Sequence, residues 1–367
     1  MAKTRKRGGY AGTPDRAHPR GRHRPRDHRG GGHGARRGGS GSGTARLAPH
    51  RRGADTFRRT GSALSPADLA RIRGEFAATL KGPVGLPEVR HPDGTEAGVL
   101  GGILRTGLDA YANVRPVATT PGIPGALAGS PRIDYVIVRE NTEGLYASRG
   151  RGVGNEHAHV DQLLVTRAGT ERIVRRAFEI AVGRSGAPAD GVRRVTCVDK
   201  ANVLPSLAFF RRVFNEVAAE FRLSHPDIVA EHRYVDACAA ELITNPGRYD
   251  VLVTENLLGD ILSDIGAATV GGLGTCPSGN LGDGAAYFEP VHGSAPDLAA
   301  SAAGPDAANP SAQIRSGAML LDHLGERAAA DRVRAAVDAV AAELIGHGEG
   351  FSCAAFAGRA AEHLRAG

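Results

Sequence analysis

Short apolar runs alternate along most of the chain with longer segments in which apolar residues recur every three or four positions. The short runs are typical of buried strands, and the longer spacing is typical of helices with one buried face. Strands are predicted to begin at Ile133, Val192, Ile228 and Tyr249, and residues 162–184 are predicted as a strand followed by a helix. This regular alternation predicts an α/β fold with a largely parallel central sheet.

Capping residues and glycines indicate several helix ends. Ser65, followed by a proline, has the position of an N-cap at the start of a helix predicted over residues 65–80. A second helix is predicted from position 101 to about position 112, with a strand after it. Two alanine-rich helices, over residues 311–323 and 325–346, are predicted to close the chain.

The first 54 residues differ in composition from the rest of the chain. They are rich in Arg, Gly, His and Pro and have almost no apolar side chains to offset the ordering entropy, so disorder is predicted. Residues 1–60 contain 17 of the 46 Lys and Arg but only 3 of the 39 acidic residues, a net charge of +14, which leaves −7 on the remainder. The body is therefore mildly acidic. A basic nucleic-acid arm would lack stacking residues, because Tyr10 is its single aromatic side chain before residue 51.

The cysteines and the hydropathy restrict the cellular setting. None of the four cysteines forms a C-x-x-C pair, so neither a zinc site nor a disulfide framework is indicated. No run of about 18 apolar residues occurs, and the basic N-terminus lacks the apolar core of a secretory signal. We expect a cytoplasmic protein with reduced thiols, no membrane partner and no nucleic-acid partner.

The stretch TENLLGDILSDIGAA contains two carboxylates one helical turn apart. Asp260 and Asp264 lie four residues apart on a helix predicted to follow the strand that begins at Tyr249, so they share one face. Carboxylate oxygens are hard ligands suited to Mg²⁺ or Mn²⁺. An isolated D-x-x-x-D is more often a solvated acidic face. Asp236, in RYVDACA, is a third possible metal ligand.

Five basic or phenolic residues could bind or protonate a substrate. Arg105, Arg115 and Arg139 lie near predicted strand or helix ends, and three guanidinium forks would suit a substrate with two or more carboxylates. Lys200 and Tyr146 are candidate proton-transfer groups, because the pKa of each side chain shifts readily near charges and metals. Taken singly, each of these residues is more often a surface or structural residue.

Six strings, in order along the chain, resemble the β-decarboxylating dehydrogenases, a family of isopropylmalate, isocitrate, homoisocitrate and tartrate/malate dehydrogenases. They are LRTGLDAYANVRPV, VRENTEGLYASRGRG, VDKANVLP, YVDACAAELITNP, TENLLGDILSDIGA and EPVHGSAPD with a later ANP. The resemblance runs from about Ala54 to the C-terminus and implies an isopropylmalate dehydrogenase-like two-domain fold with a mostly parallel central sheet. Residues 55–110 and 271–367 would form the nucleotide-binding domain, and residues 111–270 the substrate, metal and dimerisation domain.

The resemblance implies roles for the basic and phenolic residues. Arg105, Arg115 and Arg139 resemble the clamp that holds the substrate carboxylates. Tyr146 resembles the acid that protonates the enol after CO₂ leaves, and Lys200 resembles the base that deprotonates the substrate hydroxyl.

The resemblance also implies a metal site and an assembly. Asp236, Asp260 and Asp264 resemble the ligands of Mg²⁺ or Mn²⁺. In the family, Lys200 and Asp236 would be donated by the neighbouring subunit. The expected active unit is therefore a homodimer with shared active sites, acting on a small di- or tricarboxylate.

The cofactor residues follow from the same resemblance. Asn141 matches a position near the nicotinamide, and the adenosine pocket would be lined by His292, Gly293, Ser294, Ala295, Asp297 and Asn309. Asp297 stands where NADP-dependent relatives have a basic residue. Because a carboxylate accepts hydrogen bonds from a 2′-hydroxyl and repels a 2′-phosphate, NAD is favoured. The loop from Asp297 to Asn309 is longer than is usual in the family.

The N-terminal segment departs from the family pattern. The family begins with a strand and a Gly-Asp-Gly-Ile-Gly-Pro-Glu turn, which this chain lacks. MAKTRK and the sequence from ADTFRRTGSAL onwards fit the family, whereas the stretch between them is what a GC-rich gene read out of frame would encode. Residues 1–54 are therefore either a genuine disordered tail or a segment that contains the product of a compensated frameshift over about residues 7–53.

Residues 98–103 (GVLGGI) would face the group that distinguishes the family's substrates. They lack the Ser and Asn of isocitrate enzymes and the Glu-Leu-Leu of isopropylmalate enzymes, and two glycines indicate an open pocket. The predicted reaction is NAD-dependent oxidative decarboxylation of 3-isopropylmalate or a related substituted malate, with tartrate/malate second and isocitrate third. A catalytically inactive regulatory subunit is the alternative outside enzymes, and the retained base and metal residues argue against it.

Overall fold

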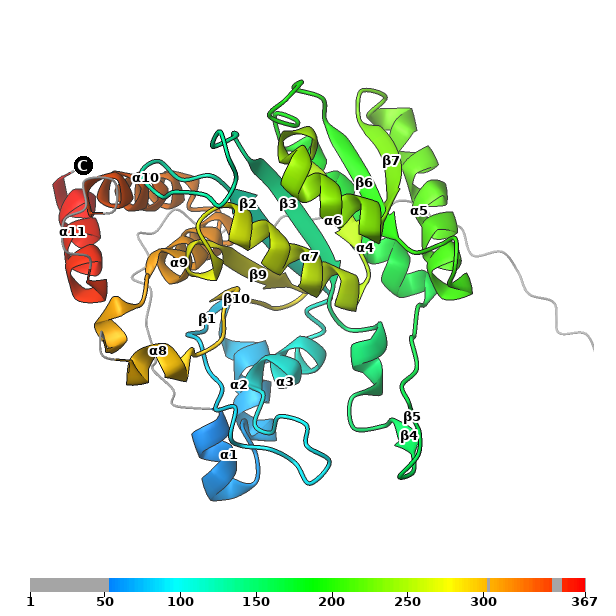
Figure 1. Cartoon of the computed structure of the whole chain (residues 1–367), viewed down its shortest axis with the longest axis horizontal. Helices are drawn as coiled ribbons and strands as arrows, with labels where there is room; N and C mark the ends of the chain where they lie inside the picture. Colours follow the sequence, from blue (N-terminus) through cyan, green and yellow to red (C-terminus); the bar gives the residue numbers. More distant parts are fainter. Residues whose placement is uncertain (1–52, 302–303, 345–351, 367) are drawn as a thin grey trace, which may run out of the picture. The chain divides into compact units, whose positions relative to one another are not determined.

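The computed structural model describes residues 53–301, 304–344 and 352–366 (Figure 1). Its main strands are β1 (Thr79–Leu80), β2 (Ala112–Ala118), β3 (Asp134–Glu140), β6 (Arg194–Asp199), β7 (Val229–Tyr234), β8 (Val251–Thr254), β9 (Pro277–Leu281) and β10 (Ala286–Pro290). Its helices are α1 (Ala54–Thr60), α2 (Pro66–Glu75), α3 (Leu100–Gly107), α4 (Arg167–Val182), α5 (Pro205–Ser224), α6 (Val235–Thr244), α7 (Asn256–Thr269), α8 (Pro296–Ala300), α9 (Ser311–His323), α10 (Arg327–Leu344) and α11 (Cys353–Ala366). All but the last two residues of the segment predicted to be disordered lie outside the described residues.

The main strands form one eight-stranded sheet in the order β1-β10-β9-β2-β3-β8-β6-β7. β3, β8, β6 and β7 run parallel to their neighbours in that series, and β1 runs parallel to β10. The pairs β10–β9, β9–β2 and β2–β3 are antiparallel. The predicted α/β fold with a mostly parallel sheet is confirmed.

Helices cover both faces of the sheet, and β3 shows how the sequence achieves this. Val136 and Val138 belong to a core cluster with α4 and α5, whereas Tyr135 and Ile137 belong to a second cluster with α6 and α7. Alternate side chains of a strand point to opposite faces, so a strand buried on both sides has a continuous apolar run. Figure 1 shows α7 lying across β2 and β3, which brings its carboxylates over the strands that bear two of the candidate arginines.

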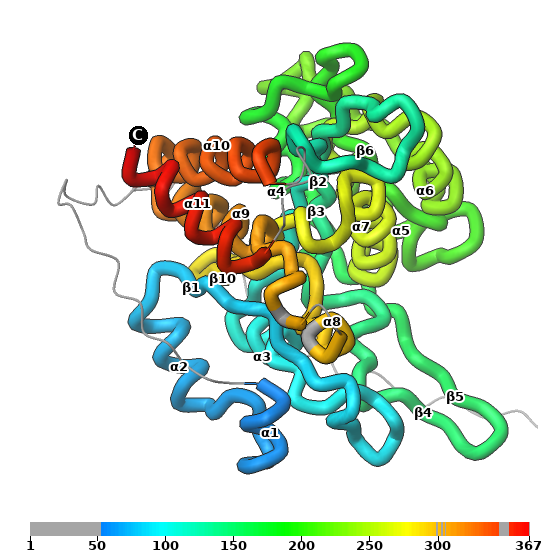
Figure 2. The backbone as a smooth tube through the Cα atoms, turned by 60° about the vertical axis from the view of Figure 1, so that its left-hand side comes forward, coloured from blue at the N-terminus to red at the C-terminus, as the bar shows by residue number. Residues whose placement is uncertain are grey.

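The C-terminal helices stack on the other end of the sheet. α9 contacts β9 and β10, α10 packs on α9, and α11 packs on α10 (Figure 2). The sequence predicted two closing helices, so α11, which buries Phe356 and Ala360 against α10, was missed. None of the helices in the described ranges is both long and apolar enough to cross a membrane.

Three predicted element bounds were wrong. The helix predicted to reach about position 112 ends at Gly107, because the chain turns through Asp109 at a φ of 47° before β2 begins. The helix with Ser65 as its confirmed N-cap ends at Glu75 rather than near position 80, and β1 follows. The strand predicted from position 162 does not form: the short hairpin of β4 (Val153–Gly154) and β5 (His159–Val160) ends before it, and Leu164 makes only an isolated bridge to Gly144.

The predicted domain boundary falls inside the continuous sheet. β1, β10 and β9 come from the ranges assigned to the nucleotide-binding domain, and β2, β3, β8, β6 and β7 come from the range assigned to the other domain. The two groups join where β9 pairs with β2 over three residue pairs. The described residues form one compact unit, and the functional division stays a prediction.

Candidate active site

Helix α7 is held unusually close to the sheet. Its first turn is capped by Glu255, whose carboxylate accepts hydrogen bonds from the backbone N–H groups of Leu257 (3.1 Å) and Leu258 (2.7 Å). One turn later a Cβ at Gly259 would lie 2.7 Å from Cγ of Arg139, closer than real Cβ atoms approach other atoms. A glycine inside a helix ordinarily costs stability. Here it lets the helix backbone rest on Arg139, with Asp260 next to it.

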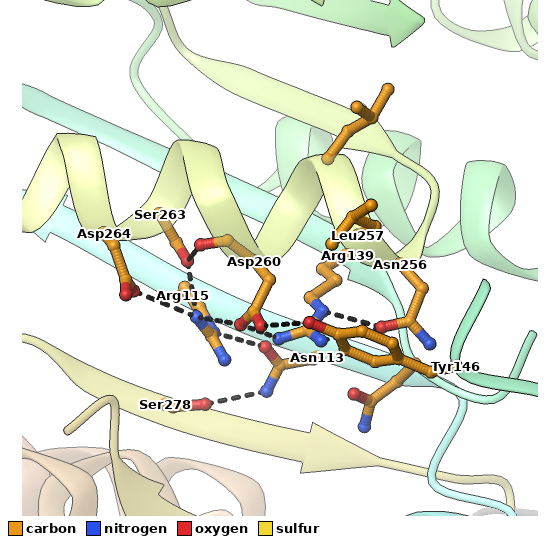
Figure 3. Close-up of polar contacts among 12 residues, drawn as sticks. Asn113, Arg115, Arg139, Tyr146, Asn256, Leu257, Asp260, Ser263, Asp264 and Ser278 are labelled. Atoms are coloured by element: carbon orange, nitrogen blue, oxygen red, sulfur yellow. Dashed lines mark hydrogen bonds and ion pairs between the residues drawn. The ribbon is translucent and has the colours of Figure 1, made fainter. Parts of the chain in front are cut away.

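Arg139, on β3, is fully buried and pairs with Asp260 (Figure 3). Its Nε and Nη2 donate to Oδ1 of Asn256 at 3.0 and 2.7 Å. Burial, and then the neighbouring Arg115 and Arg105, lower the pKa of Arg139 to about 9. Burial alone would raise the pKa of Asp260, but the guanidinium groups outweigh it and lower that pKa, so Asp260 is an anion.

Arg115, on β2, stands between the two aspartates of α7. Its Nη1 is 3.3 Å from Oδ1 of Asp260 and 3.7 Å from Oδ1 of Asp264, and it also donates to the Ser263 hydroxyl. Its Nε donates to Oδ1 of Asn113 at 2.5 Å. Figure 3 shows both carboxylates directed at this guanidinium from one side. The pair of aspartates therefore already surrounds one positive group.

Arg105, on α3, belongs to the same charged cluster, because its charge acts on both Arg139 and Asp260. Its Nε is buried and has no hydrogen-bond partner in the structure. Burial opposes its charge, but Tyr287, Glu289 and Asp260 outweigh burial and raise the pKa of Arg105. Arg105 lines the cavity described below, and a guanidinium with an unused donor is suited to bind an anion from outside the chain.

Tyr146 lies in a 3₁₀ turn (η1, Leu145–Ser148) opposite α7. Its hydroxyl donates to Oδ2 of Asp260 at 2.7 Å, and the guanidinium carbon of Arg139 is 5.4 Å from its ring centre. Burial, and then the bond to Asp260, raise the pKa of Tyr146. The phenol therefore keeps its proton at neutral pH and can give it to a stronger base.

Lys200 and Asp236 form a separate pair. Nζ of Lys200 is 2.6 Å from Oδ1 of Asp236, at the start of α6, and this hydrogen bond lowers the pKa of Asp236. Within the described part of one chain, no three His, Cys, Asp or Glu side chains come together as a metal site. A single chain therefore does not assemble the three predicted metal ligands: Asp260 and Asp264 converge, and Asp236 is apart from them.

A cavity of about 1330 Å³ opens between α3, η1 and the start of α7. Its lining includes Arg105, Tyr146, Asp260 and Asn141. The side-chain nitrogen of Asn141 donates to the carbonyl oxygen of Ala110 (2.9 Å) and to Oδ1 of Asn280 (3.0 Å), while its own Oδ1 is buried without a partner. Asn141 therefore contributes to the cavity wall and carries a buried amide oxygen without a partner.

The other predicted cofactor residues follow β10 and are not part of this lining. Ser294 donates to the carbonyl oxygen of Gly85 at 2.6 Å, and the imidazole of His292 lies 2.7 Å from the carbonyl oxygen of Gly293. Ala295 has a φ of 44° just before α8, in which Asp297 is exposed. Oδ1 of Asn309 accepts from the backbone and hydroxyl of Ser311 at the start of α9. Their role in cofactor binding stays a prediction.

Sequence reasoning missed the amides and hydroxyls that orient the arginines. Nδ2 of Asn113 donates at 2.8 Å to both the Ser278 hydroxyl and Oδ1 of Asn280, and Nδ2 of Asn280 donates to Glu289 at 3.1 Å. Glu289 in turn pairs with Lys81. The available signal was a polar residue at every second position of otherwise apolar strands, since such positions share one face.

The sequence and the fold of this chain are similar to those of known proteins. The family model described as isocitrate/isopropylmalate dehydrogenase matches residues 45–349. The chain is 42% identical over 293 residues to a 3-isopropylmalate dehydrogenase of Corynebacterium aurimucosum, over 78% of this chain and 80% of that one. It is 47% identical over 267 residues to an isocitrate/homoisocitrate dehydrogenase of Thermus thermophilus, over 72% of each chain. The crystal structure of isocitrate dehydrogenase from Methylococcus capsulatus superposes with a TM-score of 0.72 at 37% identity, over 86% of this chain and 89% of that one. The chain belongs to the isocitrate/isopropylmalate dehydrogenase family, the NAD(P)-dependent β-decarboxylating dehydrogenases.

Proposed function

We propose that this protein catalyses NAD-dependent, metal-assisted oxidative decarboxylation of a 2-hydroxy acid of the malate type. The observation that carries the proposal is the convergence of Arg105, Arg115 and Arg139, whose charges act on one another. They converge at a cavity lined by Arg105, Tyr146 and Asp260. The three guanidinium groups face two aspartates, so the cluster has a positive charge left over. A substrate with two or more carboxylates supplies the missing anions.

The residues of this chain divide the work of the reaction. The guanidinium forks hold the substrate carboxylates and fix the direction of the 2-hydroxyl. Tyr146 holds a proton on its phenol oxygen, 2.7 Å from Asp260, where it can be given to the carbon that loses CO₂. The partner subunit's Lys200 accepts the hydroxyl proton, and the partner subunit's Asp236 completes the ligand set of Asp260 and Asp264.

The residues present fit a hard divalent cation and a nicotinamide. Asp260 and Asp264 already direct oxygens at one positive group, Nη1 of Arg115, and carboxylates are the ligands that Mg²⁺ and Mn²⁺ prefer. Asn141, which lines the cavity and whose buried Oδ1 has no partner, is the residue proposed to lie beside the nicotinamide. When bound, the metal stabilises negative charge on the substrate oxygens and the nicotinamide accepts a hydride. Asp297 favours NAD over NADP.

Among malate-type substrates, 3-isopropylmalate or a related substituted malate is proposed first, with isocitrate and tartrate/malate as alternatives. The relatives include proteins named for isopropylmalate and for isocitrate or homoisocitrate, so similarity alone does not separate these acids. The glycines of α3 that line the cavity leave room for a substituent on the malate backbone.

The test is NADH formation with NAD and Mn²⁺, measured by absorbance for isopropylmalate, isocitrate, homoisocitrate, tartrate and malate. Activity with at least one acid is expected, and activity with none contradicts the proposed reaction. The shared site has its own test. Lys200→Met and Asp260→Asn should each be inactive, and a mixture refolded together should regain activity through heterodimers that contain one intact site. If the mixture stays inactive, the site is not shared between subunits.

A further inference from the structure

One arginine of the cavity has no role in the proposed reaction. Arg149, which directly follows η1, lines the cavity, and its Nη2 donates to the backbone carbonyl oxygen of Glu96 at 2.7 Å. Throughout the described ranges, Arg149 takes part in no ion pair. Its guanidinium is therefore anchored at one nitrogen and lacks a counter-anion.

Arg149 stands over Gly102 of α3, which like the adjacent Gly101 presents no side chain to the cavity. A Cβ at Gly101 would meet nothing within 4 Å, and a Cβ at Gly102 would have only Nη1 of Arg149 in range, at 3.9 Å. Gly102 and Arg105 are three residues apart and so share one face of the helix. A substrate held by Arg105 can extend along this face, and the group it meets there is the guanidinium of Arg149.

The other charged groups that line the cavity are directed elsewhere. A carboxylate oxygen of Glu96 would lie 3.2 Å from a Cβ at Gly85, and one of Asp161 would lie 2.8 Å from a Cβ at Gly152. Neither carboxylate reaches Arg149. Arg151 also lines the cavity but is not among the atoms that approach the glycine face of α3. The open space over α3 is therefore bounded by Arg105, which the proposed reaction uses, and by Arg149, a cation that it does not use.

We propose that Arg149 determines specificity, and that the preferred substrate is a malate whose 3-substituent ends in a carboxylate. This places isocitrate and homoisocitrate ahead of 3-isopropylmalate, the acid that the sequence puts first. The inference rests on the proposed function, because it concerns the substituent of the same substrate. A carboxylate there would accept charge-assisted hydrogen bonds from Arg149. An isopropyl group would reach the same guanidinium without compensating it, although Ile103 and Leu145 offer apolar contacts elsewhere in the cavity.

The experiment compares the wild-type chain, Arg149→Met and the matched control Arg151→Met, which removes the same charge from the same cavity. For each, kcat/KM is measured with isocitrate, homoisocitrate, 3-isopropylmalate and malate. Arg149→Met should lower kcat/KM for isocitrate or homoisocitrate by about 10- to 100-fold, and that for malate by less than about threefold. Arg151→Met should change every value by less than about threefold.

Two results would overturn the inference: a wild-type preference for 3-isopropylmalate over both tricarboxylates, or an equal loss with malate and isocitrate in Arg149→Met. If no acid is oxidised, the proposed function fails, and binding then decides the role of Arg149 on its own. Calorimetric titration of isocitrate with Mg²⁺ should show weaker binding to Arg149→Met than to wild type and to Arg151→Met. Equal binding to all three proteins, or no binding to any, removes the role assigned to Arg149.

Discussion

The buried ion pair between Lys81 and Glu289 gives a sharp test of how the edge of the sheet is stabilised. Lys81 directly follows β1, Glu289 lies on β10, and their side chains are only 9% and 12% exposed. Lys81→Met would remove the cation and leave the carboxylate buried. Breaking one partner of a buried pair costs about 3–5 kcal/mol. Because Arg105 also stabilises the Glu289 anion, we expect a loss near the lower value, about 3 kcal/mol.

The cost should depend on pH with a defined sign. Burial would raise the pKa of Glu289, but Lys81 and Arg105 outweigh it and lower that pKa. A lowered pKa stabilises the wild-type fold above the unfolded value of about 4.3, and this contribution is lost as pH falls through the lower folded value. Without Lys81 the main opposing charge is gone, so the pKa of Glu289 rises. The stability gap between wild type and Lys81→Met should therefore narrow from pH 7 to pH 4.

Urea unfolding followed by far-ultraviolet circular dichroism measures this cost, since the chain has no tryptophan. Glu289→Gln and the double variant complete a mutant cycle, and the amide keeps an oxygen acceptor for Asn280. The double variant should be more stable than the sum of the two single losses predicts, by about 1–3 kcal/mol. A loss below about 1 kcal/mol in Lys81→Met, or additive losses in the cycle, would refute the reasoning.

Three further changes test the site. Asp264→Asn removes one of two like charges four residues apart, and burial followed by the charge of Asp260 raises the pKa of Asp264. In metal-free buffer at pH 7 the free energy of unfolding should therefore rise by about 0.2–0.5 kcal/mol. Mg²⁺ should no longer raise the Tm of this variant, and a Tm shift with Mg²⁺ equal to that of wild type would exclude Asp264 as a ligand. Tyr146→Phe removes the proposed proton donor and should lower kcat for NADH formation about 10²- to 10⁴-fold, whereas a value near wild type would assign the proton to another group. Gly102→Ala should raise the free energy of unfolding in urea by about 0.5–1 kcal/mol, because alanine favours the helix more than glycine does. It should also lower kcat/KM for substituted malates, because the new methyl group occupies the open space over α3. An unchanged kcat/KM would show that the substituent does not bind there.

Local chemistry in the sequence predicted the parts of the fold that depend on near neighbours. Ser65 caps its helix through the N–H of Asp68, three residues away, and the i,i+4 spacing of Asp260 and Asp264 directs both carboxylates to one guanidinium. The α/β alternation was equally readable, because each buried strand needs its own apolar run.

The contacts that orient the site join distant parts of the chain and had no local signal. Asn113 meets Ser278 across 165 positions, and Lys81 meets Glu289 across 208. The end of α3 could not be predicted from the sequence either. The backbone turns through Asp109, which has a positive φ, within a segment whose residues are otherwise compatible with a helix. Nothing in the local sequence distinguished Arg149, and only its place opposite the glycines of α3 shows what it contacts.

The glycine at position 259 sets a separation that no side chain can adjust. It fixes how deeply the helix with Asp260 sits on the strand with Arg139, so the distance between the acidic and the basic half of the site is determined by backbone packing. A residue without any functional atom is therefore as intolerant of replacement as the aspartate beside it. In a saturation mutagenesis screen for activity, variants at positions 259 and 260 should be depleted together, although only Asp260 is proposed to bind a ligand.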